Sequence, residues 1–352
     1  MARDRDESSA KAGAAEPAVS GKPDAAMRGV TIAYIAESAG VSAPTVSKVL
    51  NGRPGVSDDT RARVEALINR HGYQQRAPIR SNTMELVFRD VADHWGMEIV
   101  LGVEQVARHN RVGLMVSAFD AESPLDDIVD RRPDAVLSVA RLTSADREQL
   151  SARNIAFVVF DPVEALPDDV PFVGATNWRG ARSAAQHLID LGHRRIAMIN
   201  GPDHVFCRIR RSGYADAMES AGLPVPPELL IATQLTREHG YAAARTLLAL
   251  PREKRPTAIF TASDVQAVGV YQAAREAGLS IPDDLSVVGF DDLPVAEYLD
   301  PPLTTVRQPL AEMAAAATEL ALALGRGERP AQIGLEIATT FVGRASTAPP
   351  RP

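Results

Sequence analysis

The pattern of apolar and polar positions along residues 30–50 predicts two short helices joined by a tight turn. In the first helix the apolar side chains recur at i, i+3, i+4 and i+7, the spacing of one buried helix face: Ile32, Ile35, Ala36 and Ala39. Thr31 stands where it caps this helix, and Gly40 supplies the backbone freedom that ends it. Such a pair is typical of a helix-turn-helix, although ordinary helix pairs of an α-rich domain share the pattern.

The second helix of the pair has a face that suits the major groove of DNA. Ser42 caps this helix, and Pro44 is tolerated in its first turn. Its inward face consists of Val46, Val49 and Leu50. The residues that we expect to contact DNA are small, polar or basic: Thr31, Ser42, Ala43, Pro44, Thr45, Ser47, Lys48 and Asn51.

A third helix and the local charge agree with DNA binding. Ser57 caps a helix that ends at His71, so that three short helices form a minimal core. Between Arg28 and Arg80, eight Lys or Arg oppose four Asp or Glu, which gives +4 within a chain of formal charge −7. A basic head on an acidic body suits phosphate contact at one end. A solvated charged face would have the same composition.

Length and composition bound the remaining possibilities. A chain of 352 residues predicts two or three domains, and it has no run of 18 apolar residues. The single cysteine, Cys207, excludes an internal disulfide or a cysteine-built zinc site. Residues 1–28 are rich in Ala, Gly, Ser and charge, so we expect a disordered tail rather than a signal peptide. These features favour a cytoplasmic protein.

From Met84 onward, short β-rich runs alternate with helical patterns. The expected strands are 85–88, 113–117, 135–139, 157–160, 196–200, 258–261 and 286–289. The expected helices between them include 97–109, 180–191, 208–221, 240–250 and 265–277. Alternating strands and helices predict parallel sheets covered on both faces, and the number of units favours two α/β lobes.

Several polar residues directly follow strands, where ligands bind in open α/β folds. Asp161, Asn177, Ser263 and Asp291 each lie just after an expected strand, which for Asn177 is a further one at 173–176. One such residue is more often a helix cap than a ligand contact, and we expect Asp264 to cap the helix after it. Four such positions together favour a cleft for a small polar ligand.

Nothing in the sequence favours catalysis. The adjacent carboxylates Asp291 and Asp292 point in different directions after a strand, and no P-loop, His-Glu-x-x-His or Gly-x-Ser-x-Gly pattern occurs. The seven histidines show no metal-ligand spacing. We therefore expect no enzyme, no metal and no cofactor.

Several segments together resemble the lactose-repressor (LacI/GalR) family. The headpiece segments are 30–32, 46–52, 56–57 and 71–73, and the later ones are 191–197, 286–292 and 301–308. The resemblance implies a helix-turn-helix headpiece at 29–73, a hinge linker at 74–83 and an effector-binding and dimerisation domain at 84–347. That domain would have two lobes of periplasmic-binding-protein type, about 84–176 with 306–330 and about 177–305 with 331–347. The chain would cross between them near 175–177, 305–307 and 331.

The linker departs from the family pattern. In the family this segment forms a hinge helix on DNA, and a leucine wedges into the minor groove; here that position is Asn82, and Pro78 lies within the segment. A shortened hinge helix beginning at Pro78 would let Ile79 replace the wedge and let Arg76 and Arg80 contact phosphate or the minor groove. A flexible linker is the alternative.

The resemblance also implies a ligand set and a mechanism. It assigns Arg208 as the ligand-binding arginine, Asp291 as an acceptor of ligand hydroxyls and Gln308 as a neighbour on the returning segment. The full set that we expect is Trp95, Asp161, Asn177, Trp178, Arg208, Leu235, Ser263, Asp291 and Gln308. Trp95 and Trp178 offer flat faces to a sugar ring, whereas an anionic effector held by Arg208 stays open.

The function that follows is a homodimeric transcription regulator, a repressor released from a palindromic double-stranded operator by a small sugar. The alternatives are a sugar-binding sensor that acts without DNA and a regulator that needs the ligand as co-repressor or activates. The residues do not fix the sign of control.

Overall fold

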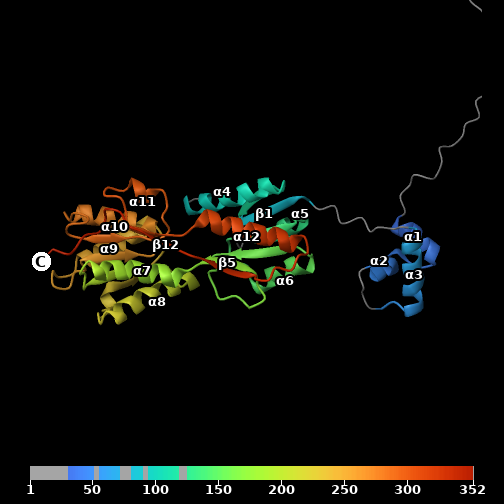
Figure 1. Cartoon of the computed structure of the whole chain (residues 1–352), viewed down its shortest axis with the longest axis horizontal. Helices are drawn as coiled ribbons and strands as arrows, with labels where there is room; N and C mark the ends of the chain where they lie inside the picture. Colours follow the sequence, from blue (N-terminus) through green and yellow to red (C-terminus); the bar gives the residue numbers. More distant parts are fainter. Residues whose placement is uncertain (1–30, 51–54, 72–80, 90–93, 119–124, 352) are drawn as a thin grey trace, which may run out of the picture. The chain divides into compact units, whose positions relative to one another are not determined.

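The computed structural model describes residues 31–50, 55–71, 81–89, 94–118 and 125–351 (Figure 1). The chain divides into two units, Met1–Ile79 and Arg80–Pro352. The expected tail, and the candidate DNA contacts Asn51, Arg76, Ile79 and Arg80, lie outside the described residues.

The first unit contains the three predicted helices, α1 (Ile32–Ala39), α2 (Ala43–Leu50) and α3 (Asp58–Arg70). The Thr31 hydroxyl accepts from the Tyr34 amide at 3.2 Å, so Thr31 is the cap that the sequence predicts. Gly40 adopts φ +64 at the turn, a conformation open to glycine. The core of the unit is formed by Ile35, Ala36, Ala39, Val46, Val49 and Val64.

The first lobe of the second unit is built on a six-stranded sheet in the order β11-β5-β4-β3-β1-β2. Its strands are β1 (Thr83–Phe88), β2 (Gly113–Ala118), β3 (Ala135–Ser138), β4 (Ala156–Phe160), β5 (Phe172–Ala175) and β11 (Gly334–Ile337), and every pairing is parallel. Helices α4 (His94–His109) and α12 (Leu310–Gly325) share one core with the sheet. Helices α5 (Asp126–Arg131) and α6 (Ser144–Ala152) pack in a second core.

The second lobe has a parallel four-stranded sheet in the order β7-β6-β8-β9. Its strands are β6 (Ile196–Asn200), β7 (Leu230–Ala232), β8 (Ala258–Thr261) and β9 (Ser286–Val288). Helices α7 (Asn177–Asp190) and α8 (Val205–Ser220) form one core with the sheet, and α9 (Arg237–Leu248) and α10 (Asp264–Glu276) form another. Two short helices, η2 (Pro227–Leu229) and α11 (Val295–Tyr298), complete it. The predicted two α/β lobes are thus present.

Within the residues that the structure describes, the chain crosses between the lobes three times, at 175–177, 307–310 and 337–340. The second crossing follows β10 (Thr305–Arg307) and the third precedes β12 (Thr340–Val342), and these two strands pair antiparallel. The expected crossing near Ala331 is wrong, because β11 still pairs with β5 in the first lobe. β11 is an edge strand with alternating exposure, so its four residues lack the continuous apolar run of a central strand.

Asn82, just before β1, occupies the position where the resemblance places a wedging leucine. Its side-chain amide donates to the Arg111 carbonyl at 2.7 Å, and its backbone adopts φ +52. Asparagine tolerates this left-handed conformation better than leucine does. Asn82 therefore fixes the start of β1 to the turn after α4.

Candidate functional site

A cavity of about 210 Å³ lies between the lobes, at the carboxyl ends of their strands. Both lobes contribute to its wall, with Trp95 from α4 and Asp161 after β4 on one side and residues after β8 and β9 on the other. Six of the nine expected ligand residues line this cavity: Trp95, Asp161, Leu235, Ser263, Asp291 and Gln308. Asn177, Trp178 and Arg208 do not.

The buried cation of the cavity is Arg210, which the sequence reasoning missed. Its side chain is 2% exposed. Nε donates to the Asn177 side-chain oxygen at 2.8 Å, and Nη1 donates to the Ala262 carbonyl at 2.6 Å. Nη1 also lies 3.7 Å from an Asp291 carboxylate oxygen. The guanidinium stacks over the Phe290 ring at 3.8 Å, which holds its plane in place.

Arg208, the residue expected in this role, lies on another face of the same helix. Its side chain is half exposed and donates to the Asp203 carboxylate at 2.8 Å. Residues two apart on a helix do not share a face, so only one of the two arginines points into the cleft. The inward stripe of α8 contains Cys207, Arg210, Tyr214 and Ala217. These residues follow one another at intervals of three, four and three positions, the spacing of one helix face. Arg210 has this spacing and Arg208 does not, so the sequence contained a signal that distinguishes them.

Asn177 and Trp178, which the sequence also assigns to the ligand site, do not line this cavity either. Asn177 is buried and acts on Arg210, while its amide donates to the Ala175 carbonyl at 3.1 Å. Trp178 is 42% exposed on α7, with the Arg182 guanidinium 5.9 Å from its ring. It therefore offers no ring face to the cavity. Trp95 does line the cavity and packs edge-on against Phe160 at 6.0 Å.

Asp291 and Gln308 form one polar wall of the cavity. The Gln308 amide donates to the Asp291 carboxylate at 2.6 Å, and the Gln308 backbone N–H donates to the Asp291 carbonyl at 3.1 Å. The Gln308 side-chain oxygen is buried and has no hydrogen-bond partner among the described residues. An unpaired buried acceptor of this kind is favourable only when a ligand or water donates to it.

Asp161 is a second buried carboxyl in the wall. It has φ +44, a left-handed backbone that turns its side chain toward the cleft. Burial raises the pKa of Asp161 from 3.8 to about 6, while the charge of Arg210 and a hydrogen bond with Asn177 lower it. Asp161 is thus a carboxyl that titrates close to neutral pH.

His204 is a further cavity residue that the sequence reasoning did not include. Its Nδ1 is buried without a hydrogen-bond partner in the part of the chain that the structure describes. Burial lowers the pKa of His204, and the neighbouring charge of Arg89 lowers it further. The ring is therefore neutral at pH 7. No sequence motif marked it, because it lies in a loop before α8.

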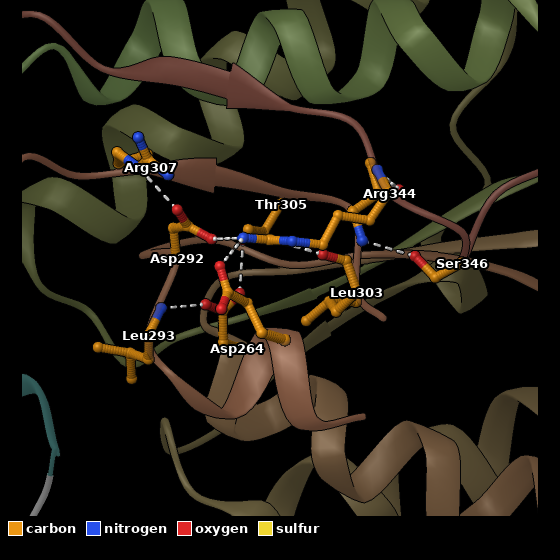
Figure 2. Close-up of polar contacts among 10 residues, drawn as sticks. Asp264, Asp292, Leu293, Leu303, Thr305, Arg307, Arg344 and Ser346 are labelled. Carbon is orange, nitrogen blue, oxygen red and sulfur yellow. Dashed lines mark hydrogen bonds and ion pairs between the residues drawn. The ribbon is translucent and has the colours of Figure 1, made fainter. Parts of the chain in front are cut away.

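The expectation for Asp264 is wrong, because Ser263 caps α10. The Ser263 hydroxyl accepts from the Gln266 amide at 3.2 Å. Asp264 instead accepts from the Thr305 hydroxyl at 2.6 Å and from the Leu293 amide at 2.8 Å (Figure 2). Burial raises the pKa of Asp264 well above 3.8. Asp264 thus fastens the loop after β9 to β10.

The candidate DNA face is a separate surface on α2. Ala43, Pro44 and Lys48 are exposed and Thr45 and Ser47 are half-buried, while Val46 and Val49 are in the core. The Ser42 hydroxyl accepts weakly from the Thr45 amide, at 3.4 Å. The apolar side of α2 thus packs inward and the candidate contacts lie on or beside the outer side.

The two units match two protein-family models. Residues 31–75 match "Bacterial regulatory proteins, lacI family", and residues 185–347 match "Periplasmic binding protein-like domain". The transcriptional regulator DegA of Bacillus subtilis is 32% identical over 336 residues, which cover 91% of this chain and 98% of DegA. The ribose operon repressor of Escherichia coli K12 is 33% identical over 297 residues, covering 80% of this chain and 89% of the repressor.

Solved structures agree with these matches. A complex of the transcriptional regulator CelR with cellobiose has a TM-score of 0.70 and 31% identity, covering 90% of this chain and 99% of CelR. The lac repressor dimer bound to operator and the anti-inducer ONPF has a TM-score of 0.67 and 25% identity, covering 91% of this chain and all of that one. A LacI-family regulator from Enterococcus faecium with bound ribose has a TM-score of 0.68 and 27% identity, covering 76% and 99%. The relatives named here are transcriptional regulators.

Proposed function

The chain belongs to the LacI family of bacterial regulatory proteins, and from this premise we propose that it represses transcription by binding a palindromic operator, which a small sugar makes it release. In this proposal the headpiece reads DNA and the cavity between the lobes binds the effector.

The proposal that the effector is a sugar rests on one observation: the cavity wall has hydrogen-bond donors and acceptors next to one another. Arg210 is a buried donor, whereas Asp161 and Asp291 are buried acceptors. Adjacent hydroxyls of a sugar both donate and accept, so they satisfy such a wall with charge-assisted hydrogen bonds. An anionic effector would meet two carboxyls and one arginine, which disfavours it. The cellobiose and ribose complexes of relatives support the same ligand class.

The DNA half rests on α2 and on the relatives. The exposed side chains of α2 are small or basic, and the lac repressor structure contains operator DNA. We assign the linker residues Arg76, Ile79 and Arg80 to the same interface on the family resemblance. A regulator that binds DNA in a bacterium works in the cytoplasm, which is where we place this protein. No helix in the described part of the chain is long and apolar enough to span a membrane.

A homodimer fits both halves of the proposal. One short recognition helix reads too few bases for specificity, so two headpieces must act together on two half-sites. The second unit exposes large apolar side chains that a second copy would cover, namely Met97, Leu101, Met115, Val116 and Tyr298. Tyr298 is 80% exposed, which is unusual for an aromatic side chain without a partner surface.

A direct experiment takes the full chain and selects bound duplexes from a random pool. We expect a palindromic sequence, and we expect D-ribose, cellobiose or another sugar from a thermal-shift panel to lower the affinity for it. A protein that binds sugar but enriches no sequence would be a sensor acting without DNA. A ligand that strengthens operator binding would reverse the sign of control, making it a co-repressor.

A further inference from the structure

The loop after β9 turns two adjacent carboxylates to opposite sides. Asp291 and Asp292 adopt φ +116 and φ +62, both left-handed conformations. Asp291 lines the cavity. Asp292 faces two segments, one that leads into the first lobe after β10 and one that comes back from it before β12. One of these two neighbouring residues therefore faces the ligand cavity, and the other faces the segments that cross between the lobes.

Asp292 contacts an arginine from each of two crossing segments (Figure 2). Arg307 ends β10, just before the chain leaves for the first lobe, and its Nε donates to Asp292 at 2.7 Å. Arg344 follows β12, just after the chain returns, and its Nη2 lies 2.7 Å from the other Asp292 oxygen. The Asp292 side chain is only 5% exposed and that of Arg344 13%, so their ion pair is shielded from solvent, whereas the Arg307 side chain is half exposed.

Further bonds tie the same loop to the crossing strand. The Asp291 amide donates to the Val306 carbonyl at 2.8 Å, and Asp264 binds both Leu293 and Thr305. Gly289 permits this packing, because a Cβ there would lie 2.1 Å from an Asp264 oxygen. The cavity carboxylate and two of the three crossings are thus parts of one bonded unit.

We propose that Asp292 is a positioning residue that sets the relative orientation of the two lobes by holding both crossing segments against the loop that carries Asp291. A ligand that contacts Asp291 then acts on the orientation of the lobes through that loop. This second step rests on the proposed function, whereas the role of Asp292 in lobe orientation does not.

The test measures the lobes directly, without DNA or effector. Nitroxide labels at Arg153→Cys in the first lobe and Glu253→Cys in the second report the interlobe distance by pulsed electron resonance, since both positions are exposed and Cys207 is buried. We expect Asp292→Asn, which keeps the size and the left-handed backbone, to broaden or shift the distance distribution. Asp216→Asn breaks an arginine pair between α7 and α8, away from the crossings, and should leave the distribution unchanged.

Arg307→Gln is a second variant that tests the proposal if Asp292→Asn does not fold. The Arg307 side chain is half exposed, so its loss leaves the cores intact while removing one half of the clamp. If the Asp292→Asn protein folds and has the interlobe distance distribution of the wild type, the proposal is wrong. If the Asp292→Asn protein does not fold, the proposal is wrong when Arg307→Gln leaves that distance distribution unchanged. A wild-type protein that binds no D-ribose, cellobiose or DNA would instead count against the proposed function alone. Where D-ribose or cellobiose does bind, Asp292→Asn should reduce the ligand's effect on operator affinity by about tenfold.

Discussion

Gln308 donates its amide to Asp291 at 2.6 Å while its own side-chain oxygen stays buried without a partner among the described residues. The amide orientation is thus fixed by the carboxylate, which leaves the oxygen as an acceptor without a partner, among the described residues, on a side chain that lines the cavity. Because Asp291 is an acceptor, the same wall presents two acceptors side by side. The occupant must therefore carry at least two donors on neighbouring atoms, as a sugar diol does.

Replacing Gln308 tests this reading of the wall. Gln308→Leu keeps most of the volume but removes the acceptor and the donor to Asp291, so we expect sugar affinity to fall by about 1–3 kcal/mol. Gln308→Glu should cost more, because it adds a carboxylate beside Asp291. Isothermal titration with the sugar found in the thermal-shift panel measures both. Wild-type affinity in the leucine variant would mean that the ligand does not reach this wall.

Two arginines on one helix give a matched pair of variants. Arg210→Gln leaves Asn177 and the Ala262 carbonyl without their donor and Asp291 without its nearby cation, so sugar affinity should fall by about 2–5 kcal/mol. Arg208→Gln removes only an exposed pair with Asp203, and its effect should stay below about 1 kcal/mol. Titration of both variants, with melting curves as a check on folding, distinguishes them. The opposite order of effects would restore Arg208 as the ligand-binding arginine.

The DNA face is tested by the salt dependence of binding. Lys48 is exposed on α2, and a lysine that contacts phosphate releases about one counterion. Lys48→Gln should therefore weaken binding to all duplexes alike and reduce the slope of log affinity against log salt by about one. Anisotropy titrations at several salt concentrations measure this slope. Arg153→Gln, an equal charge change in the other unit, should leave this slope unchanged. An equal decrease of the slope in both variants would indicate a long-range charge effect.

The sequence allowed prediction of the elements that have strong local signals. All seven expected strands are present, because each is a short run rich in apolar residues. β10 and β11 each interrupt their apolar residues with a charged one, Arg307 and Glu336, and β11 lies at a sheet edge. The crossing near 331 was misplaced for that reason. Tertiary pairing, not local propensity, makes these strands.

The candidate site was predictable by position and less so by orientation. Residues after strands were found because parallel strands end at one edge, and Asp161 and Asp291 do line the cavity. Trp178 and Arg208 do not line the cavity, because their direction depends on helix phase, which a motif alone does not give. Asp264 failed because a tertiary bond to Thr305 replaced the expected local cap.

The buried carboxyl of Asp161 predicts opposite effects on stability and on ligand binding. Its pKa is raised from 3.8 to about 6 by burial, so the folded protein binds this proton more tightly than the unfolded chain does. Its contribution to stability is therefore fully present below about pH 4 and is lost as the pH rises through about 6. Asp161→Asn removes this titration, so at pH 7.5 the variant should be more stable than the wild type by up to about 3 kcal/mol. The difference should vanish near pH 4.

The same substitution should weaken sugar binding above pH 6, because an amide is a poorer acceptor for a hydroxyl than a carboxylate. Wild-type affinity should likewise fall as the pH drops through about 6 and Asp161 takes up its proton, a fall that Asp161→Asn should lack. Denaturant melts and titrations between pH 4.5 and about 8 measure both effects. Asp169→Asn, an exposed carboxyl of the same lobe, is the control and should follow the wild type in both. A variant that loses stability at pH 7.5 would mean that the Asp161 carboxylate is held by contacts stronger than its burial penalty.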